Sequence, residues 1–373
     1  MTHPVLDMDA LLTDGRTRIV VTCGSGGVGK TTTAAAMALR AADSGRTVAV
    51  LTIDPARRLA QAMGLSELDN SPRRVQVDTG GELWAMMLDT RRTFDEMVAA
   101  HASPERAEQI YANPFYRTIS SSFSGTQEYM AMEKLGQLAQ TGEYDLIVVD
   151  TPPSRSALDF LDAPQRLSSF LDGRMIRLLA TPGRGVMKIV GAGFSLFTKA
   201  VTAVIGGQML ADATRFVQLF EDMFGGFRQR AEATYTLLRD RGSSFVVVAT
   251  CEAEALREAS YFADRLVTEH MPLAGLVLNR THPPHAEVPL AAAESGLEQL
   301  TRADAGDSKA TALAGAALRI HADRLVTRTE ELRMRARFDR AHPDIPVVEV
   351  PAQHTDVHDI DGLRAVGEAL AGR

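Results

Sequence analysis

The residues with the clearest chemical potential lie in a glycine-rich segment, GSGGVGKTT at 24–32. Its pattern, Gly-x₄-Gly-Lys-Thr, follows an apolar run and precedes a helical one, as a phosphate-binding loop does. In such a loop backbone amides turn inward around phosphate, the lysine reaches the terminal phosphates and the threonine hydroxyl ligates Mg²⁺. We therefore predict that ATP is bound by Gly26, Gly27, Val28, Gly29, Lys30, Thr31 and Thr32.

Two aspartates end apolar runs elsewhere in the chain. Asp150 closes DLIVVD, and in proteins with a phosphate loop a carboxylate at this place holds Mg²⁺, directly or through water. Asp54 closes TVAVLTID, where a carboxylate near the γ-phosphate can orient or deprotonate the attacking water. Each also has a structural alternative: Asp150 could cap the following turn, and Asp54 could cap a helix that starts at Pro55. We predict Asp54 and Lys30 as catalytic residues, and Thr31 and Asp150 as the magnesium site.

Six short apolar runs supply the elements that would position these residues. Continuous apolar runs of this length are typical of buried parallel strands, and helical patterns separate them. The sequence therefore predicts an α/β fold, a doubly wound and mainly parallel sheet of the P-loop NTPase type. The runs cover 18–23, 47–54, 145–150, 244–250, 273–279 and 346–351.

The spacing of these runs is uneven. Roughly 90 residues separate the second run from the third, and roughly 90 the third from the fourth, although a crossover needs only about a dozen. Because structureless loops of that length are rare, the surplus is expected to be helical. We predict one P-loop ATPase domain over residues 1–373, with a helical subdomain inserted at roughly 90–140 and 160–235.

Phenylalanines are concentrated in the second of these insertions. Phe216, Phe220, Phe224 and Phe227 have the spacing of one helix face. Such a face could line a groove for an apolar helical client. Aromatic residues at helical spacing more often pack in a core, so both interpretations stay open.

Composition excludes several classes of protein. With 40 basic and 47 acidic residues the net charge is −7, which gives no electrostatic basis for binding nucleic acid. Two cysteines, Cys23 and Cys251, cannot form a disulfide framework or a four-thiolate zinc site. The most lipid-like stretch, 186–210, is interrupted by Lys188 and Lys199, and the N-terminus does not resemble a signal peptide. We expect a cytoplasmic protein that is not itself transmembrane.

Seven motifs together resemble one family, the arsenite-pump ATPases and their relatives that target tail-anchored membrane proteins. The resemblance covers nearly the whole chain, and the order of the motifs makes it specific. They are GSGGVGKTT, IDPARRL, GTQEYMAMEKL, VVDTPPSRSALDFL, VVVATCEAEALREA, GLVLNR and VVEVPAQHTDVHDIDGLRAVG.

The resemblance implies an Mg-ATP-dependent ATPase that acts as a nucleotide-gated dimeric switch. Asp54 would belong to a first switch that positions water, and Asp150 to a second. Asn279 matches the position that reads adenine, and Pro351 begins the loop on the other side of the base. The partners implied are a second subunit and an apolar helical client or a membrane protein.

The chain departs from the family pattern at Ser25. The family's loop usually begins Gly-Lys-Gly-Gly, and that lysine crosses the dimer interface to the partner's nucleotide, whereas position 25 is serine here. A neutral hydroxyl cannot supply this charge to a phosphoryl transition state. Two functions stay open: an ATPase working as a homodimer, or a nucleotide-binding interaction protein with little turnover that pairs with a lysine-bearing paralogue. The chain also has no Cys-x-x-Cys pair for zinc and no cysteine cluster for arsenite.

Overall fold

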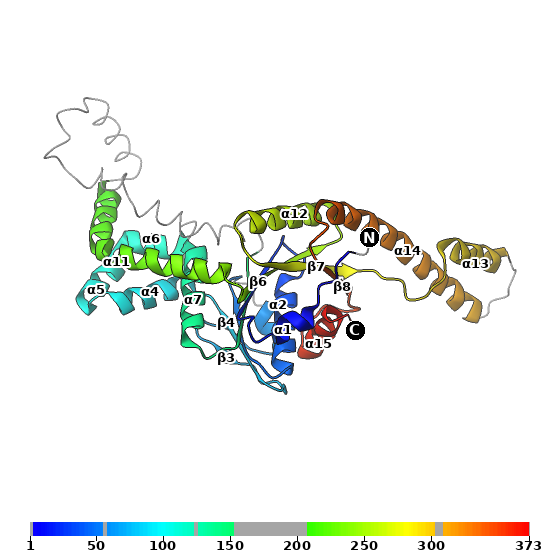
Figure 1. Ribbon diagram of the computed structural model, residues 1–373, viewed down its shortest axis with the longest axis horizontal. Helices are drawn as coiled ribbons and strands as arrows, with labels where there is room; N and C mark the ends of the chain where they lie inside the picture. Colours follow the sequence, from blue (N-terminus) through cyan, green and yellow to red (C-terminus); the bar gives the residue numbers. More distant parts are fainter. Residues whose placement is uncertain (1–2, 55–57, 123–125, 153–206, 303–308, 373) are drawn as a thin grey trace, which may run out of the picture.

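The structure of the chain is a computed structural model, in which residues 3–54, 58–122, 126–152, 207–302 and 309–372 are described (Figure 1). In chain order the elements are α1 (Met8–Thr13), β1 (Ile19–Cys23), α2 (Lys30–Asp43), β2 (Thr47–Thr52), α3 (Arg58–Ala62), β3 (Arg73–Arg74), β4 (Glu82–Met87), α4 (Thr90–His101), α5 (Pro104–Ala112), α6 (Pro114–Ser122), α7 (Thr126–Thr141), β5 (Leu146–Asp150), α11 (Gly207–Arg239), β6 (Ser243–Thr250), α12 (Ala253–Thr268), β7 (Leu273–Thr281), α13 (Leu290–Arg302), α14 (Lys309–Ala341), β8 (Val347–Pro351) and α15 (Ile360–Leu370).

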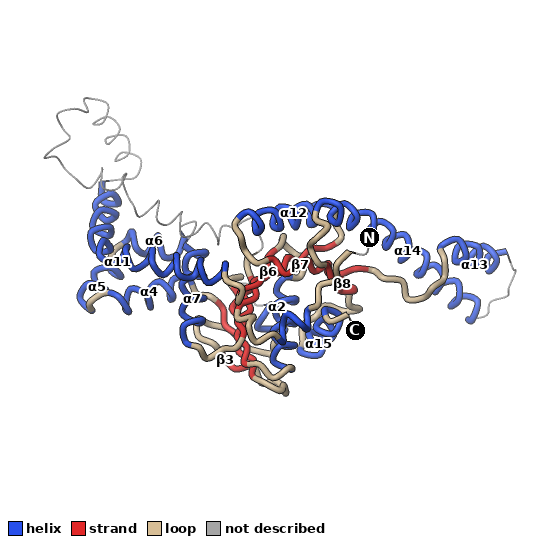
Figure 2. Tube along the Cα trace, viewed as in Figure 1, coloured by secondary structure: helices blue, strands red, loops and turns tan. Residues whose placement is uncertain are grey.

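One sheet of eight strands organises the chain, in the order β3-β4-β2-β5-β1-β6-β7-β8. Figure 2 shows the strands in red at the centre of the molecule. Neighbouring strands are parallel except for β3, which is antiparallel to β4. The central strands β1 and β5 are buried along their whole length, which explains why their sequences are continuous apolar runs. The predicted α/β fold is confirmed, and all six predicted strands are present.

Residues 73–87 correct the expectation that the first long insertion is helical. They contain β3 and β4, and β4 extends the sheet beside β2. A short, mainly apolar segment such as ELWAMM fits either a strand or a helix turn, and pairing with β2 decides between them.

Helices cover both faces of the sheet. Helix α12 lies on one side of β6 and β7, whereas α1, α2 and α15 lie on the other (Figure 1). Helix α2 carries six alanines that are buried against its neighbours. Small side chains bring this helix close to the sheet, and its first residue, Lys30, follows the loop that leaves the carboxyl end of β1.

Helices α4 to α7 and α11 form a bundle at the end of the molecule beyond β4 (Figure 1). Aromatic rings fill its interior. Phe216, Phe220 and Phe227 are at most 2% exposed. The centroid of each of these rings lies within 6.5 Å of the ring centroid of Tyr116 or Phe94. These three rings pack in the core of the bundle, and a client groove stays a prediction. The side chain of Phe224 and residues 160–206 lie outside the described part, and the predicted domain division stays a prediction.

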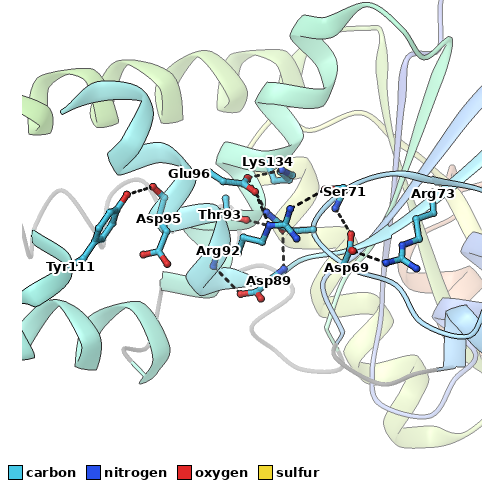
Figure 3. A network of polar contacts seen from close by, with 11 residues as sticks. Asp69, Ser71, Arg73, Asp89, Arg92, Thr93, Asp95, Glu96, Tyr111 and Lys134 are labelled. Carbon is cyan, nitrogen blue, oxygen red and sulfur yellow. Dashed lines mark hydrogen bonds and ion pairs between the residues drawn. The ribbon is translucent and has the colours of Figure 1, made fainter. Parts of the chain in front are cut away.

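A polar network ties this bundle to the segment that follows α3 (Figure 3). Asn70 is fully buried; its Nδ2 donates to Glu96 of α4, and its Oδ1 accepts from Thr93 Oγ1. Glu96 also accepts from Arg92 at 3.0 Å and from Lys134 of α7 at 3.1 Å. The network fixes α4 and α7 relative to the sheet.

A helical hairpin projects from the opposite end of the molecule (Figure 1). We call α13 together with residues 309–325 of α14 the arm. The rest of α14 packs on the body through buried Phe338 and through Arg328, which lies 2.8 Å from Glu349 of β8. The arm was not among the predicted elements. No helix in the described ranges has the length and apolar character needed to cross a bilayer.

Candidate functional site

Two glycines shape the phosphate loop. A Cβ at Gly24, whose φ is +151°, would lie 2.1 Å from the carbonyl oxygen of Val248 in β6. A Cβ at Gly29, with φ of +94°, would lie 2.2 Å from Nδ2 of Asn279 in β7. Only glycine allows this close approach and this left-handed backbone, so the loop is seated on two strands of the sheet. Gly26 and Gly27, between them, are exposed.

Lys30 is the first residue of α2 and is 5% exposed. Its Nζ donates to the carbonyl oxygen of Ser25 at 2.7 Å, so the ammonium group points back into the loop. Burial lowers the pKa of this lysine, and the nearby carboxylate of Asp150 opposes that shift.

Asp150 is fully buried at the end of β5. The register places it opposite Thr22 of β1 and Thr52 of β2. Its Oδ2 accepts from Thr31 Oγ1 at 2.8 Å and from Thr52 Oγ1 at 2.9 Å, while its Oδ1 is buried with no hydrogen-bond partner. Burial raises the pKa of this carboxyl to about 6, and the two hydroxyl bonds limit the rise.

Asp54 follows β2 and is held by its backbone. Its amide donates to Thr52 Oγ1 at 3.2 Å, and the preceding residue, Ile53, donates its amide to the carbonyl oxygen of Asp150 at 2.9 Å. The carbonyl oxygen of Ile53 accepts from Gln127 Nε2 of α7 at 2.9 Å. Asp54 therefore stands beside Asp150, and Pro55 lies outside the described residues.

Asn279 and Pro351 come together from neighbouring strands. β7 and β8 pair so that Asn279 lies opposite Val350, next to Pro351. Asn279 is 9% exposed, and its Nδ2 donates to the carbonyl oxygen of Val28 at 2.8 Å. Both predicted base-binding residues thus lie at the carboxyl edge of the sheet, one of them in contact with the phosphate loop.

A cleft of about 290 Å³ adjoins the loop. It is lined by Ser25 and the residues after it, by the start of α12 with Glu252, and by Arg280. Arg280 occupies the irregularity in the pairing of β7 with β8, and its φ of +58° is unusual for a residue other than glycine. Such irregularities often redirect a side chain beside an active site, and here the side chain lines the cleft.

The chemistry of this donor set suits a magnesium–nucleotide complex. Carboxylate and hydroxyl oxygens are the ligands that Mg²⁺ prefers, and the buried Oδ1 of Asp150 lacks any other partner. Exposed glycine amides at the start of a helix suit phosphate.

Sequence comparison gives the family. A profile of anion-transporting ATPases matches residues 17–299, most of the chain. This chain belongs to the anion-transporting ATPase family. The predicted resemblance is confirmed, and nucleotide binding is implied by a family of ATPases.

The chain shares about a quarter of its residues with several ATPases. The chain is 28% identical to ATPase GET3 of Malassezia globosa over 246 residues, 66% of either chain. It is 26% identical to ATPase GET3B of Arabidopsis thaliana over 309 residues, 76% of this chain and 69% of the relative. It is 25% identical to ATPase ARSA1 of Chlamydomonas reinhardtii over 70% of this chain and 35% of the relative. The matches to GET3 of Malassezia globosa and of Podospora anserina span 66% and 55% of those proteins.

The structure brings together every predicted site residue of this anion-transporting ATPase along one edge of the sheet. Thr52 and Gln127 were not predicted. Thr52 lies inside a predicted strand and Gln127 inside a motif of the resemblance, but only the fold shows that they contact Asp150 and Ile53. Arg280 was also missed, since a bulge has no clear sequence signal.

The buried carboxyl of Asp150 yields a prediction about stability. Because the folded state raises its pKa from 3.8 to about 6, the folded state binds more protons than the unfolded state between these values. Stability from this group is therefore lost as the pH rises through that window, by up to about 3 kcal/mol. Asp150→Asn retains an oxygen for the two threonines, so it should raise the free energy of unfolding at pH 8 and have little effect near pH 4.

Denaturant unfolding of both proteins from pH 4 to pH 8 measures this difference. Asp78→Asn, at an exposed carboxylate, serves as the control and should show no such trend. A difference between Asp150→Asn and the parent that does not vary with pH would contradict the prediction.

Proposed function

We propose that the chain is a magnesium-dependent ATPase whose conformation and dimerisation respond to ATP. The observation that carries the proposal is the convergence of Lys30, Thr31 and Asp150 beside Asp54, with Asp150 Oδ2 already bonded to the Thr31 hydroxyl. The relatives' printed names, ATPase GET3 and ATPase ARSA1, support turnover as the activity.

Each residue has a role in this proposal. The amides of the loop from Gly26 to Thr32 would bind the phosphates, and Lys30 would turn from the Ser25 carbonyl to the terminal phosphates. Thr31 and Asp150 would hold Mg²⁺, with Asp150 acting directly or through water. When bound, the metal neutralises charge that develops on the transferring phosphoryl group.

Asp54 would orient the attacking water or accept its proton. Its backbone is held beside Asp150 through Thr52 and Ile53, which suits a carboxylate that must meet the γ-phosphate. Asn279 and Pro351 would hold adenine from two strands. An asparagine amide has two hydrogens, so the bond to Val28 still leaves one hydrogen and the oxygen for the base.

Two substitutions test this assignment together. Lys30→Ala should weaken ATP binding, because it removes the only side-chain cation inside the described phosphate loop. Asp54→Asn should bind ATP like the parent but lose hydrolysis by ~100-fold or more, within the range for a general base. Calorimetric titration with Mg-ATP and steady-state phosphate release measure the two effects.

Either variant serves as the control for the other. Parental affinity in Lys30→Ala would refute the binding site, and parental turnover in Asp54→Asn would refute the role of this carboxylate in positioning water.

Ser25 favours a second function, that of a nucleotide-binding protein with little turnover that pairs with a paralogue. Ser25 lines the cleft beside the loop, at the position where the family carries its lysine. A homodimer would lack this cation at both sites, whereas a paralogue with the lysine would restore it at one. A homodimer and a heterodimer therefore differ in the chemistry that they can perform.

Ser25→Lys distinguishes these functions. If the missing cation limits a homodimer, the variant should raise the rate of ATP hydrolysis by ~10-fold or more, since such cations contribute orders of magnitude. Ser25→Met, of similar length and without charge, should leave the rate unchanged. Steady-state hydrolysis measures both, and equal rates in the two variants would show that the charge is not limiting.

Gln127 supplies a further test, because it holds the backbone just before Asp54. Gln127→Met cannot donate to Ile53, so Asp54 should lose its position and kcat should fall by ~10- to 100-fold, with KM for ATP changed much less. Gln140→Met, on the exposed side of the same helix, should match the parent. A rise in KM without a fall in kcat would contradict this role.

A further inference from the structure

The arm is a short antiparallel pair of helices that stands clear of the sheet (Figure 1). The less exposed residues of each helix recur at alternating intervals of three and four, which is the spacing of an antiparallel coiled coil. They are Leu290, Ala293, Leu297 and Leu300 on α13, and Thr311, Gly315, Leu318 and Ala322 on α14. A Cβ at Gly296 would lie 3.0 Å from Leu318 Cδ1, which shows that these two faces meet.

The face of α14 turned away from α13 is apolar and exposed. Leu313 is 72% exposed and Ile320 is 65% exposed. They are seven residues apart, almost two turns, and lie roughly opposite the line that meets α13. Ala316 and Ala317, which are also exposed, lie between them. Large apolar side chains of this exposure, with small ones between them, are typical of a helix that binds another helix.

Charges along this face indicate what binds there. Three exposed residues follow one another at intervals of seven, beside the row formed by Leu313 and Ile320. They are Lys309, Ala316 and Asp323. Two copies of α14 packed antiparallel around Ala316 would place Lys309 of each beside Asp323 of the other. Parallel packing would instead oppose like charges. The face is therefore complementary to itself in one orientation.

We propose that this face of α14 binds the same face of a second copy of the chain, antiparallel, about a two-fold axis near Ala316. Leu313 of one copy then packs against Ile320 of the other, twice. Exposed ion pairs contribute little affinity, so the leucine and isoleucine provide the attraction and the charges set the orientation. The contact needs no nucleotide, and it goes beyond the proposed ATPase function.

The first experiment measures mass against protein concentration by sedimentation, without nucleotide. The parent should form a dimer as concentration rises, and Leu313→Glu should weaken that dimer by at least ~100-fold, because it places a charge in the contact. Val326→Glu is the matched control: Val326 is 52% exposed on the same helix but lies off the apolar line, so its dimer should be unchanged. A parent that stays monomeric, or equal effects of the two variants, would overturn the proposal.

The second experiment tests the orientation by exchanging charges. Lys309→Glu and Asp323→Lys should each weaken the dimer by ~5- to 30-fold, since each creates two like-charge contacts. The double variant restores opposite charges and should recover to within a few-fold of the parent. A double variant as weak as the single ones would exclude the antiparallel contact.

The same measurements in the Lys30→Ala background separate this contact from a nucleotide-dependent dimer. Self-association through the arm should persist in Lys30→Ala and disappear when Leu313→Glu is added. Association that requires Mg-ATP and survives Leu313→Glu would belong to the proposed switch, so either proposal can fail without the other.

Discussion

The buried carboxylate of Asp150 is the interaction on which the site depends. It joins the first turn of α2, through Thr31, to the end of β2, through Thr52. A charged group with one unsatisfied oxygen destabilises the folded state, as the raised pKa shows. Perturbed, buried titratable groups cluster at functional sites, which makes this residue the best marker of the site.

From this residue, short contacts lead outward to the helical bundle. The carbonyl oxygen of Asp150 holds Ile53, and Ile53 is bonded to Gln127 at the start of α7. Further along α7, Lys134 meets Glu96 of α4 (Figure 3). The helical bundle is thus connected to Asp150 by hydrogen bonds and by helix α7, so these contacts form a continuous physical path between the two.

The sequence was sufficient for whatever depends on local pattern. The phosphate loop, both aspartates and the six apolar strands are each encoded by adjacent residues, so their positions were predictable. Contacts that require the folded chain were not. Thr52 and Gln127 are polar residues with no distinguishing spacing, and they acquire a role only when β5 and α7 come beside β2. Strand β4 was missed because pairing with β2, and not its composition, decides its structure.

Helix α14, part of which forms the arm, was also difficult to predict from sequence pattern. Helix α14 has no single apolar face along its length, because different parts of it meet different neighbours. Near the end of the helix, Phe338 packs on the body. In the arm, the side of the helix that carries Leu318 meets α13, and the side that carries Leu313 is exposed. A helix whose apolar residues point in several directions gives a weak periodic signal, even where some of those directions are packed against neighbouring elements. Leu313 and Ile320 are the most exposed large apolar residues of α14 in the described part of the chain, and the self-complementary charges beside them fit a second copy there.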